Sequence, residues 1–543
     1  MESQRHRITK IIVTLGIHSS SQEELVQLIH AGMDVARISD RFLLTSNKTE
    51  VLRNLKAAMA ETGKQVGVML SLRESDIRFK TPEAGGVLQL HEGDIVKVVT
   101  DLADVVAGEK AVLCNNKEFP LLVKPNDKLL IDFGKIIFTV IDVENSGQTQ
   151  ASMLNGKTRD NIIYKLNASC DQQIKIEAEV GSMTAPAPRS DRPMRIKPKS
   201  PRSKHIVVCR VENECTFWAH KPVHISPSDA EAVPPVLSIT HEAEDIKAIE
   251  WANENDIDFV VYKQVREKDD LVDMLRFSVP NAKKFVGIQS KEASDIYPDL
   301  LRMADGIVIG RGSLALETSL AHVCQLQKDI TLEANSCGKP VIISTQILES
   351  MVYSARPGVT EALDVTNAVI DGCDGFVLTA ETAYGLNPVR AVQACVSLCL
   401  EAEAVIDYER ENEKMLRGMS SMSIIENICY CAVRSVLSIQ AHLIACITNS
   451  GATALMISHF RPPCPILAIT NRQKTVRQLR IIRGVFPAYC DETARLDIAL
   501  VNVAMEVAVR DGLAKSGDVF VYVSGGHDFQ AGDTSSLRIC KVP

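Results

Sequence analysis

Short apolar runs rich in Val and Ile recur along the chain, each followed by a stretch with the pattern of a helix. Eight of these runs have the length of buried strands. They are Lys10–Thr14, Asp34–Ile38, Gly67–Ser71, Asp258–Tyr262, Phe285–Gln289, Gly306–Gly310, Pro340–Thr345 and Gly375–Glu381. Eight strands that alternate with helices predict an α/β fold of the (β/α)8, or TIM, barrel type. Catalytic residues of such a barrel are expected at the C-terminal ends of its strands.

The interval between the third and fourth strands is far longer than a helical connection requires. It contains strand-like runs separated by polar turns, at Val87–Thr100, Lys128–Val143 and His205–Asn213. We therefore predict an inserted domain, β-barrel-like in form, after the third barrel strand.

Beyond the eighth strand, two helical stretches precede a further alternation of strands and helices. The helical stretches are Arg390–Ala404 and Ile424–Leu437, and the strand-like runs are Ala441–Thr448, Cys464–Thr470 and Gly517–Gly525. This alternation predicts a separate C-terminal α/β domain. The predicted segments are barrel residues 1–84, the insert 85–225, barrel residues 226–400 and the C-terminal domain 401–543.

Composition narrows the class of protein. A chain of 543 residues suits about three or four domains, and 45% hydrophobic with 24% charged residues is typical of a globular protein. A formal net charge of −8 gives no reason to expect nucleic-acid binding, and no run approaches the about 18 apolar residues of a membrane helix. Fifteen cysteines without paired spacing predict reduced thiols, so we expect a cytoplasmic protein that does not bind membranes.

One segment of the insert is strongly basic and rich in proline. Residues 185–204 hold seven cations and a single aspartate, and the spacing of their prolines forbids a helix. Two interpretations remain open, a solvated linker and a docking site for an acidic protein or filament surface.

Two stretches carry recognisable motifs. Gly338–Met351 (GKPVIISTQILESM) resembles the pyruvate kinase segment around A-T-Q-M-L-E-S-M, and Val377–Val392 (VLTAETAYGLNPVRAV) resembles that family's S-G-E-T-A-x-G-x-x-P-x-x-A-V. The blocks TKIIVTLG, AGMDVAR and ADGIVIGRG follow in the family's order, so the chain is identified as a member of the pyruvate kinase family. The resemblance implies phosphate transfer from phosphoenolpyruvate to ADP with Mg²⁺ or Mn²⁺ and K⁺. It also implies a homotetramer and, in many members, a sugar-phosphate effector site in the C-terminal domain.

The family's divalent-metal ligands are missing. They are a glutamate after strand five, in K-x-E-N, and an aspartate after strand six, in A-R-G-D. An ungapped count from Gly310 places the glutamate at Gln289, the aspartate at Ser313 and the family's catalytic lysine at Gly287. Because Mg²⁺ prefers anionic oxygen ligands, we expect no tightly bound cofactor, and Mg²⁺ and K⁺ are implied by the resemblance alone.

A nearby pair does not restore the site. Lys291 and Glu292 lie just downstream, but adjacent strand residues point in opposite directions, whereas the family's lysine and glutamate share a face.

The family's K⁺ ligands are also replaced. They come from an N-F-S-H stretch after strand two and an Asp-Thr pair after strand three. The corresponding residues here are Ser39, Arg41, Ser71 and Leu72. We expect the guanidinium of Arg41 to occupy the K⁺ position and to exclude the ion by charge repulsion. After strand four, Lys263 replaces a serine and adds a second cation.

Other positions keep the family's residues. Arg37 and Arg78 match arginines that contact phosphate, Thr345 matches the threonine beside the reacting carbon, and Glu381 keeps its place in its motif. We further expect the backbone N–H groups of the segment that holds Arg311, Gly312 and Ser313 to form an anion cradle at a helix N-terminus. The alternative is that the retained residues now serve packing and ion pairing.

The C-terminal domain keeps part of an effector loop. The sequence TNSGAT resembles the family's T-K-S-G-R-S, and its candidate phosphate-binding residues are Thr448, Asn449, Ser450, Gly451 and Thr453. Asn449 stands in place of the lysine and Ala452 in place of the arginine, so the loop keeps its hydroxyls and loses its cations.

Two hypotheses for function follow. The first is a pyruvate kinase homologue that has lost catalysis and serves a binding, regulatory or structural role. The second is an active, slow pyruvate kinase whose metal is held through nucleotide phosphates and water. An unrelated barrel enzyme is harder to support, because the strand ends offer no Ser/His/Asp set and no Cys/His metal cluster.

Overall fold

The eight predicted strands form one closed, all-parallel barrel. A computed structural model describes residues 5–543 except 40–44, 73–76, 83–86, 106–107, 133, 147–203, 219–220, 227, 229–241, 264, 277, 418–420, 492–496 and 526–533. The barrel order is β1-β17-β16-β15-β14-β13-β3-β2. Its strands are β1 (Lys10–Thr14), β2 (Val35–Ser39), β3 (Gly67–Ser71), β13 (Phe259–Tyr262), β14 (Lys283–Ile288), β15 (Gly306–Gly310), β16 (Val341–Ser344) and β17 (Gly375–Leu378). The predicted TIM-barrel fold is confirmed.

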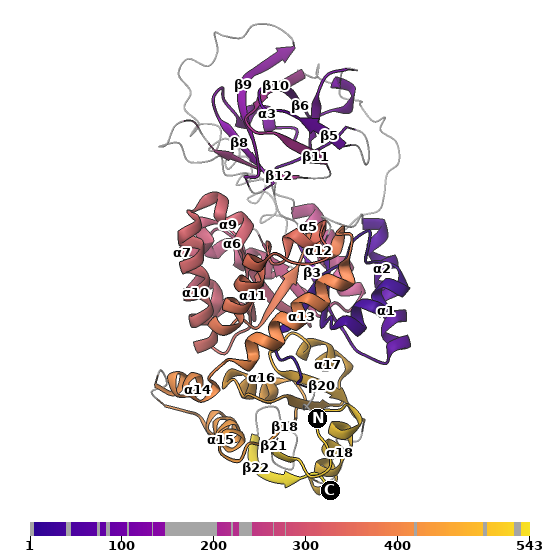
Figure 1. The fold of residues 1–543 in the computed structure, drawn as a ribbon, viewed down its shortest axis with the longest axis vertical. Coiled ribbons are helices and arrows are strands. Elements are labelled where there is room, and N and C mark those ends of the chain that lie inside the picture. Colours follow the sequence, from indigo (N-terminus) through magenta and orange to yellow (C-terminus); the bar gives the residue numbers. More distant parts are fainter. Residues whose placement is uncertain are drawn as a thin grey trace, which may run out of the picture. The chain divides into compact units, whose positions relative to one another are not determined.

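Helices surround this barrel (Figure 1). They are α1 (Gln22–Ala31), α2 (Thr45–Thr62), α5 (Glu242–Glu254), α6 (Lys268–Arg276), α7 (Lys291–Asp295), α8 (Tyr297–Met303), α9 (Arg311–Glu317), α10 (Leu320–Ser336), α11 (Val359–Asp371), α12 (Ala380–Ala383) and α13 (Pro388–Ala404), with a 3-10 turn η2 (Glu349–Val352). Local sequence sets their ends. In α1, Ser21 and Glu24 form a capping box and Gly32 ends the helix at φ 116°, which favours glycine.

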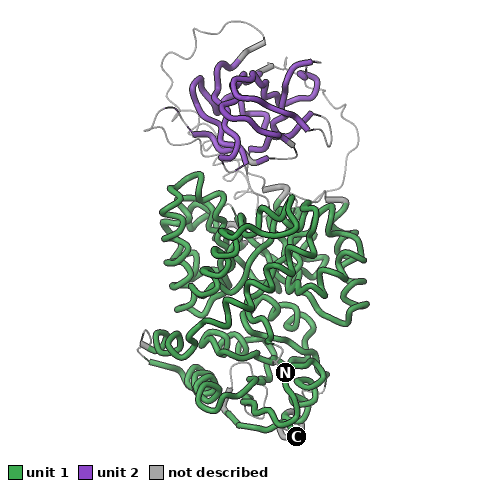
Figure 2. Tube along the Cα trace, in the orientation of Figure 1, with its two compact units in different colours: residues 1–75, 237–543 green, residues 76–236 purple. Residues whose placement is uncertain are grey.

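The insert forms a second closed barrel, and this part of the chain is a compact unit of its own (Figure 2). Its barrel order is β10-β6-β7-β4-β12-β8-β9, and β11 pairs with β5. Its elements are β4 (Ile77–Lys80), β5 (Val87–Leu90), β6 (Ile95–Val99), η1 (Leu102–Asp104), β7 (Ala111–Cys114), α3 (Phe119–Leu122), β8 (Lys128–Ile131), β9 (Ile136–Ser146), β10 (Lys204–Val211), β11 (Cys215–Trp218) and β12 (Lys221–Ser226).

The unit's boundaries differ from the sequence prediction. It spans Asp76–Val236 rather than 85–225, because β4 pairs with β7 and β12 and so belongs to the insert. Of the predicted basic loop, residues 185–203 lie outside the described residues, and Lys204 begins β10. The proposed docking role of this loop therefore stays a sequence-based hypothesis.

The C-terminal domain is built on a five-stranded sheet in the order β20-β19-β18-β21-β22. Its elements are α14 (Tyr408–Arg417), α15 (Ile424–Ile439), β18 (Leu443–Ile447), α16 (Ala452–His459), β19 (Ile466–Thr470), α17 (Gln473–Leu479), β20 (Val485–Tyr489), α18 (Asp497–Arg510), β21 (Val519–Gly525) and β22 (Thr534–Lys541). The sequence analysis located β18, β19 and β21 and missed β20 and β22. Only β22 is antiparallel to its neighbour.

This domain packs against the N-terminal end of the barrel and belongs to the same compact unit (Figure 1). One hydrophobic core includes barrel residues such as Ile12 and Phe285 together with Phe460 and Leu479 of the C-terminal domain. Because the barrel interior and the domain share this core, the two are stabilised together.

Four aspartates, here called the floor aspartates, precede alternate barrel strands. Each carboxylate accepts a hydrogen bond from a backbone N–H of the preceding strand at 2.8–2.9 Å, in the pairs Asp34 with Ile11, Asp258 with Val68, Asp305 with Lys284 and Asp374 with Val341. These bonds tie neighbouring strands together at the barrel floor.

Three floor aspartates are buried and paired with arginine. Asp34 lies 2.8 Å from Arg7, and Asp258 lies 3.0 Å from Arg477. Asp374 lies 3.0 Å from Arg461 of the C-terminal domain. Burial opposes ionisation of Asp34, but the positive charges of Arg7 and Lys10 outweigh it and lower the pKa of this carboxyl. Asp305 is the exception, since its partner Lys283 is half exposed.

We expect Asp258→Ala to lower the free energy of unfolding by about 2–3 kcal/mol, because the buried N–H of Val68 loses its acceptor and Arg477 keeps only its exposed partner Asp256. Asp305→Ala is the matched control, and we expect a loss of only about 1 kcal/mol at this exposed pair. Urea unfolding of both variants measures the difference. Equal losses would show that burial of the pair does not set its contribution.

Candidate active site

The C-terminal ends of β14 and β15 lie side by side, and the predicted metal positions Gln289 and Ser313 follow them in the chain. Ile288 pairs with Ile309, so Gln289 lies beside Gly310. A Cβ atom built on Gly310 would lie 2.6 Å from Cγ of Gln289, which shows that the glutamine side chain lies across this glycine. The A-R-G-D motif has alanine at this position, and alanine would push Gln289 away.

The resulting group of atoms does not fit a divalent metal. Gln289 offers an amide and Ser313, half-buried in α9, offers a hydroxyl. Within the described ranges, no three His, Cys, Asp or Glu side chains come together in a way that could hold a metal ion. Mg²⁺ gives up its water reluctantly and needs charged oxygen ligands, so neutral donors alone do not supply its site.

The downstream pair, Lys291 and Glu292, is used elsewhere. Both lie in α7, where Glu292 binds Arg266 at 2.7 Å and Lys291 binds Asp295 at 2.9 Å. Both residues lie in a helix and not in a strand, so the strand alternation assumed from the sequence does not apply, and their ion pairs engage them at α7.

A different lysine lies beside the vacated position. A Cβ atom built on Gly287 would meet Cα and Cγ of Lys263 at 3.4 Å. The buried stem of Lys263, at the end of β13, thus occupies space next to the residue where the family has its lysine. The family's lysine on β14 is absent here, and Lys263, which follows the adjacent strand β13, lies beside its position.

Arg37 bridges three strands at the barrel mouth. It is 5% exposed, and its guanidinium donates to Oγ1 of Thr14 and to Oγ of Ser71, each at 3.1 Å. Ser71 stands where the family has a K⁺-binding carboxylate. The guanidinium of Arg37 therefore already contacts this predicted K⁺ position.

The structure describes only some of the other residues that the sequence assigns to K⁺ or phosphate binding. Ser39 and Leu72 are buried, and Arg41, to which the sequence analysis assigned the K⁺ position, lies outside the described residues. Arg78 lies in β4 and so belongs to the separate unit formed by the insert.

The predicted anion cradle is partly occupied by contacts within the protein. The N–H of Gly312 donates to Oγ1 of Thr345 at 2.8 Å. The guanidinium of Arg311 binds Asp364 at 2.6 Å and the backbone carbonyls of Thr345 and Gln346. The N–H of Gly312 and the side chain of Arg311 thus hold the loop after β16 in place, and an anion at this helix N-terminus remains a prediction.

The loop that they hold is strained. Thr345 and Gln346 adopt φ of 69° and 54°, a left-handed conformation that is unfavourable for the β-branched Thr345. Such strain persists where the surroundings determine the backbone, and here Arg311 and Gly312 do so. No pattern in the sequence signals this conformation.

Comparisons with known proteins agree with the geometry. The family model described as pyruvate kinase, barrel domain, matches residues 6–167 and 190–392, and the model for the alpha/beta domain matches residues 426–540. This chain belongs to the pyruvate kinase family. It is 30% identical to pyruvate kinase of Dictyostelium discoideum, over 98% of this chain and 94% of the relative. It is 29% identical to the cytosolic isozyme of Glycine max, over 98% and 96%.

The motif glutamate of this pyruvate kinase homologue has a structural role. Glu381 is 1% exposed, and its carboxylate accepts from the N–H groups of Leu348 and Thr379 at 3.1 and 2.7 Å. Burial raises the pKa of Glu381, although these bonds favour its charged form. The residue joins the loops after β16 and β17.

The effector loop of the family keeps a closed turn. Oγ1 of Thr448 accepts from the N–H of Gly451 at 2.9 Å, and the carbonyl of Asn449 accepts from Thr475. Gly451 has φ 89°, and a side chain there would meet Leu479 at 2.9 Å, so glycine is required. Ser450 and Thr453 flank this turn.

Every cysteine in the described ranges is free. In those same ranges, no helix combines the length and the apolar character needed to cross a membrane.

We expect K⁺ to raise the melting temperature no more than Na⁺ at equal concentration. Arg37 already contacts Ser71, and a cation added there meets like charge. Thermal melts in KCl and NaCl, which keep the anion constant, measure the difference. A rise that is specific to K⁺ would contradict the assignment of this site.

Proposed function

We propose that this pyruvate kinase homologue has lost phosphoryl transfer and serves a binding, regulatory or structural role. The observation that carries the proposal is the neutral pair Gln289 and Ser313 where the family holds its metal. The loss of lysine at Gly287 adds to it, since phosphoryl transfer depends on cations that stabilise the transferring group.

Magnitudes support this choice. Loss of one donor to a developing anion typically costs about 10²–10³ in rate. Loss of the metal ligands should lower the rate further, although the rate effects of residues that act together are not simply multiplied. Together they leave little rate enhancement.

The alternative is an active, weaker pyruvate kinase in which nucleotide phosphates and water hold the metal. The near full-length similarity to named pyruvate kinases favours it, as do the retained Thr345, Glu381 and Arg37. The metal site argues against this alternative. With neutral residues at both metal positions, the nucleotide phosphates would have to supply every charged ligand of the metal.

A retained ligand for the barrel mouth would be an anion held without metal. Lys263 and Arg37 place two cations there, and the metal-binding carboxylates that would repel an anion are replaced. By analogy with its relatives, among them cytosolic isozymes, we further propose a cytoplasmic homotetramer.

We expect turnover at least about 10⁴-fold below that of an active relative. A coupled assay with phosphoenolpyruvate, ADP, Mg²⁺ and K⁺ on purified protein measures it. Robust Mg²⁺-dependent formation of pyruvate would support the alternative and reject the proposal.

Restoring the site requires four changes. Gly287→Lys, Gln289→Glu and Ser313→Asp return the family residues, and Lys263→Ser removes the stem and charge that lie against position 287. We expect this variant to bind Mn²⁺ more tightly than the natural chain. The control carries Ser313→Asn in place of Ser313→Asp, and equal Mn²⁺ affinity in the two variants would show that the register is wrong.

The basic segment 185–204 suits an acidic partner surface. If it docks, association should weaken steeply as salt rises, because screening acts within about 8 Å at physiological ionic strength. Pull-downs from extract with the full chain and a chain lacking residues 185–204 test this. If both chains capture the same partners at low salt, the segment is a linker and not a docking site.

A further inference from the structure

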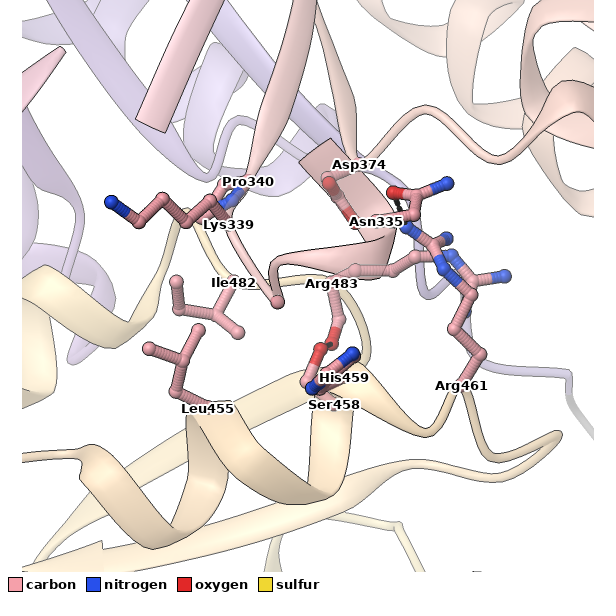
Figure 3. A pocket seen from close by; sticks show the side chains of 11 residues that line it. Asn335, Lys339, Pro340, Asp374, Leu455, Ser458, His459, Arg461, Ile482 and Arg483 are labelled. Carbon is pink, nitrogen blue, oxygen red and sulfur yellow. Dashed lines mark hydrogen bonds and ion pairs between the residues drawn. The ribbon is translucent and has the colours of Figure 1, made fainter. Parts of the chain in front are cut away.

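A small cavity lies where the barrel floor meets the C-terminal domain (Figure 3). Asn335 at the end of α10 and Asp374 before β17 line its barrel side, and His459 of α16 with Arg461 and Arg483 line its other side. The volume of the cavity is about 20 Å³. That is room for one small species and far too little for a sugar phosphate or a nucleotide.

Arg461 has one unused donor in this cavity. Its Nη2 binds Oδ1 of Asp374 at 3.0 Å and also donates to Asn335. Its Nη1 is buried and has no hydrogen-bond partner in the described structure. The backbone here is strained, at φ 48°, so the position of the guanidinium is held at a conformational cost.

Arg483 supplies a second unused donor. The residue is 4% exposed, and its Nε is buried with no partner among the described residues. Its guanidinium lies over the ring of Tyr408, 5.9 Å from the centroid. Burial opposes the charge of Arg483, but Tyr408 and Glu403 outweigh it and raise the pKa of this arginine, while the carboxylate of Glu403 itself accepts from the N–H groups of Ile8 and Thr9.

The charges around the cavity are not balanced. Its lining holds the guanidinium groups of Arg461 and Arg483 and a single carboxylate, Asp374, while the ammonium of Lys339 donates to the backbone carbonyls of Leu301, Arg302 and Ala304. Burial lowers the pKa of Arg461, and the positive charge of Arg483 lowers it further, against the effect of Asp374. Within the lining, two guanidinium groups with unused donors share this one carboxylate, so an occupant that accepts hydrogen bonds and carries negative charge is favoured.

We propose that the cavity binds one small inorganic anion, of the size of chloride, between Arg461 and Arg483. A water molecule would satisfy the same two donors but would leave the charge uncompensated. Both arginines belong to the C-terminal domain, and the bound anion would offset the repulsion between their guanidinium groups where this domain meets the barrel. This inference is independent of whether the barrel mouth is catalytic.

The test is the dependence of the melting temperature on chloride, with gluconate as an anion too large for the cavity, at equal ionic strength. We expect the natural chain to show a chloride-specific rise that saturates. Arg461→Lys keeps a positive charge that can pair with Asp374 but removes the unused Nη1, so its chloride-specific rise should disappear. Arg302→Lys, at an exposed ion pair, is the matched control and should keep the rise.

A second measurement does not depend on the variants. Bromide scatters anomalously, and crystals of the natural chain grown with NaBr should show a peak between Arg461 and Arg483. A water molecule without anomalous signal at that place would overturn the proposal. An unchanged chloride-specific rise in Arg461→Lys would overturn it as well.

Discussion

The floor aspartates connect the strands of the barrel to one another and the barrel to the C-terminal domain. Each carboxylate binds an N–H group of the strand before it, and Asp258 and Asp374 also bind arginines of that domain. A carboxylate that satisfies both a backbone donor and an arginine is difficult to replace, because its loss leaves a buried N–H group without an acceptor and removes the buried partner of the arginine. The barrel floor is therefore constrained by stability.

The barrel mouth is under a different constraint. Residues that bind metal or substrate contribute little to stability and often reduce it, so their loss leaves a fold intact. Gln289 lies across Gly310 without a clash, and Lys263 packs against Gly287. The pyruvate kinase fold of this chain is thus well formed around a mouth that lacks the family's charged metal ligands.

The sequence by itself determined the order of strands and the missing charges. Runs of β-branched residues at regular spacing require a buried parallel sheet, and eight of them close into a barrel. The neutral residues Gln289 and Ser313 were found by counting along a motif, which needs no coordinates. The edges of the insert and the strands β20 and β22 were not found, because pairing with distant strands defines them rather than local pattern.

Only the tertiary structure decided what the retained residues do. Arg37 contacts Ser71, and Gly312 donates to Thr345, although sequence reasoning assigned these groups to ions and anions. Those contacts join strands and loops that lie far apart in the chain, and they depend on register and side-chain rotamer. Residue identity fixes which charges exist, whereas the packing of neighbouring strands fixes which of them remain available to a ligand.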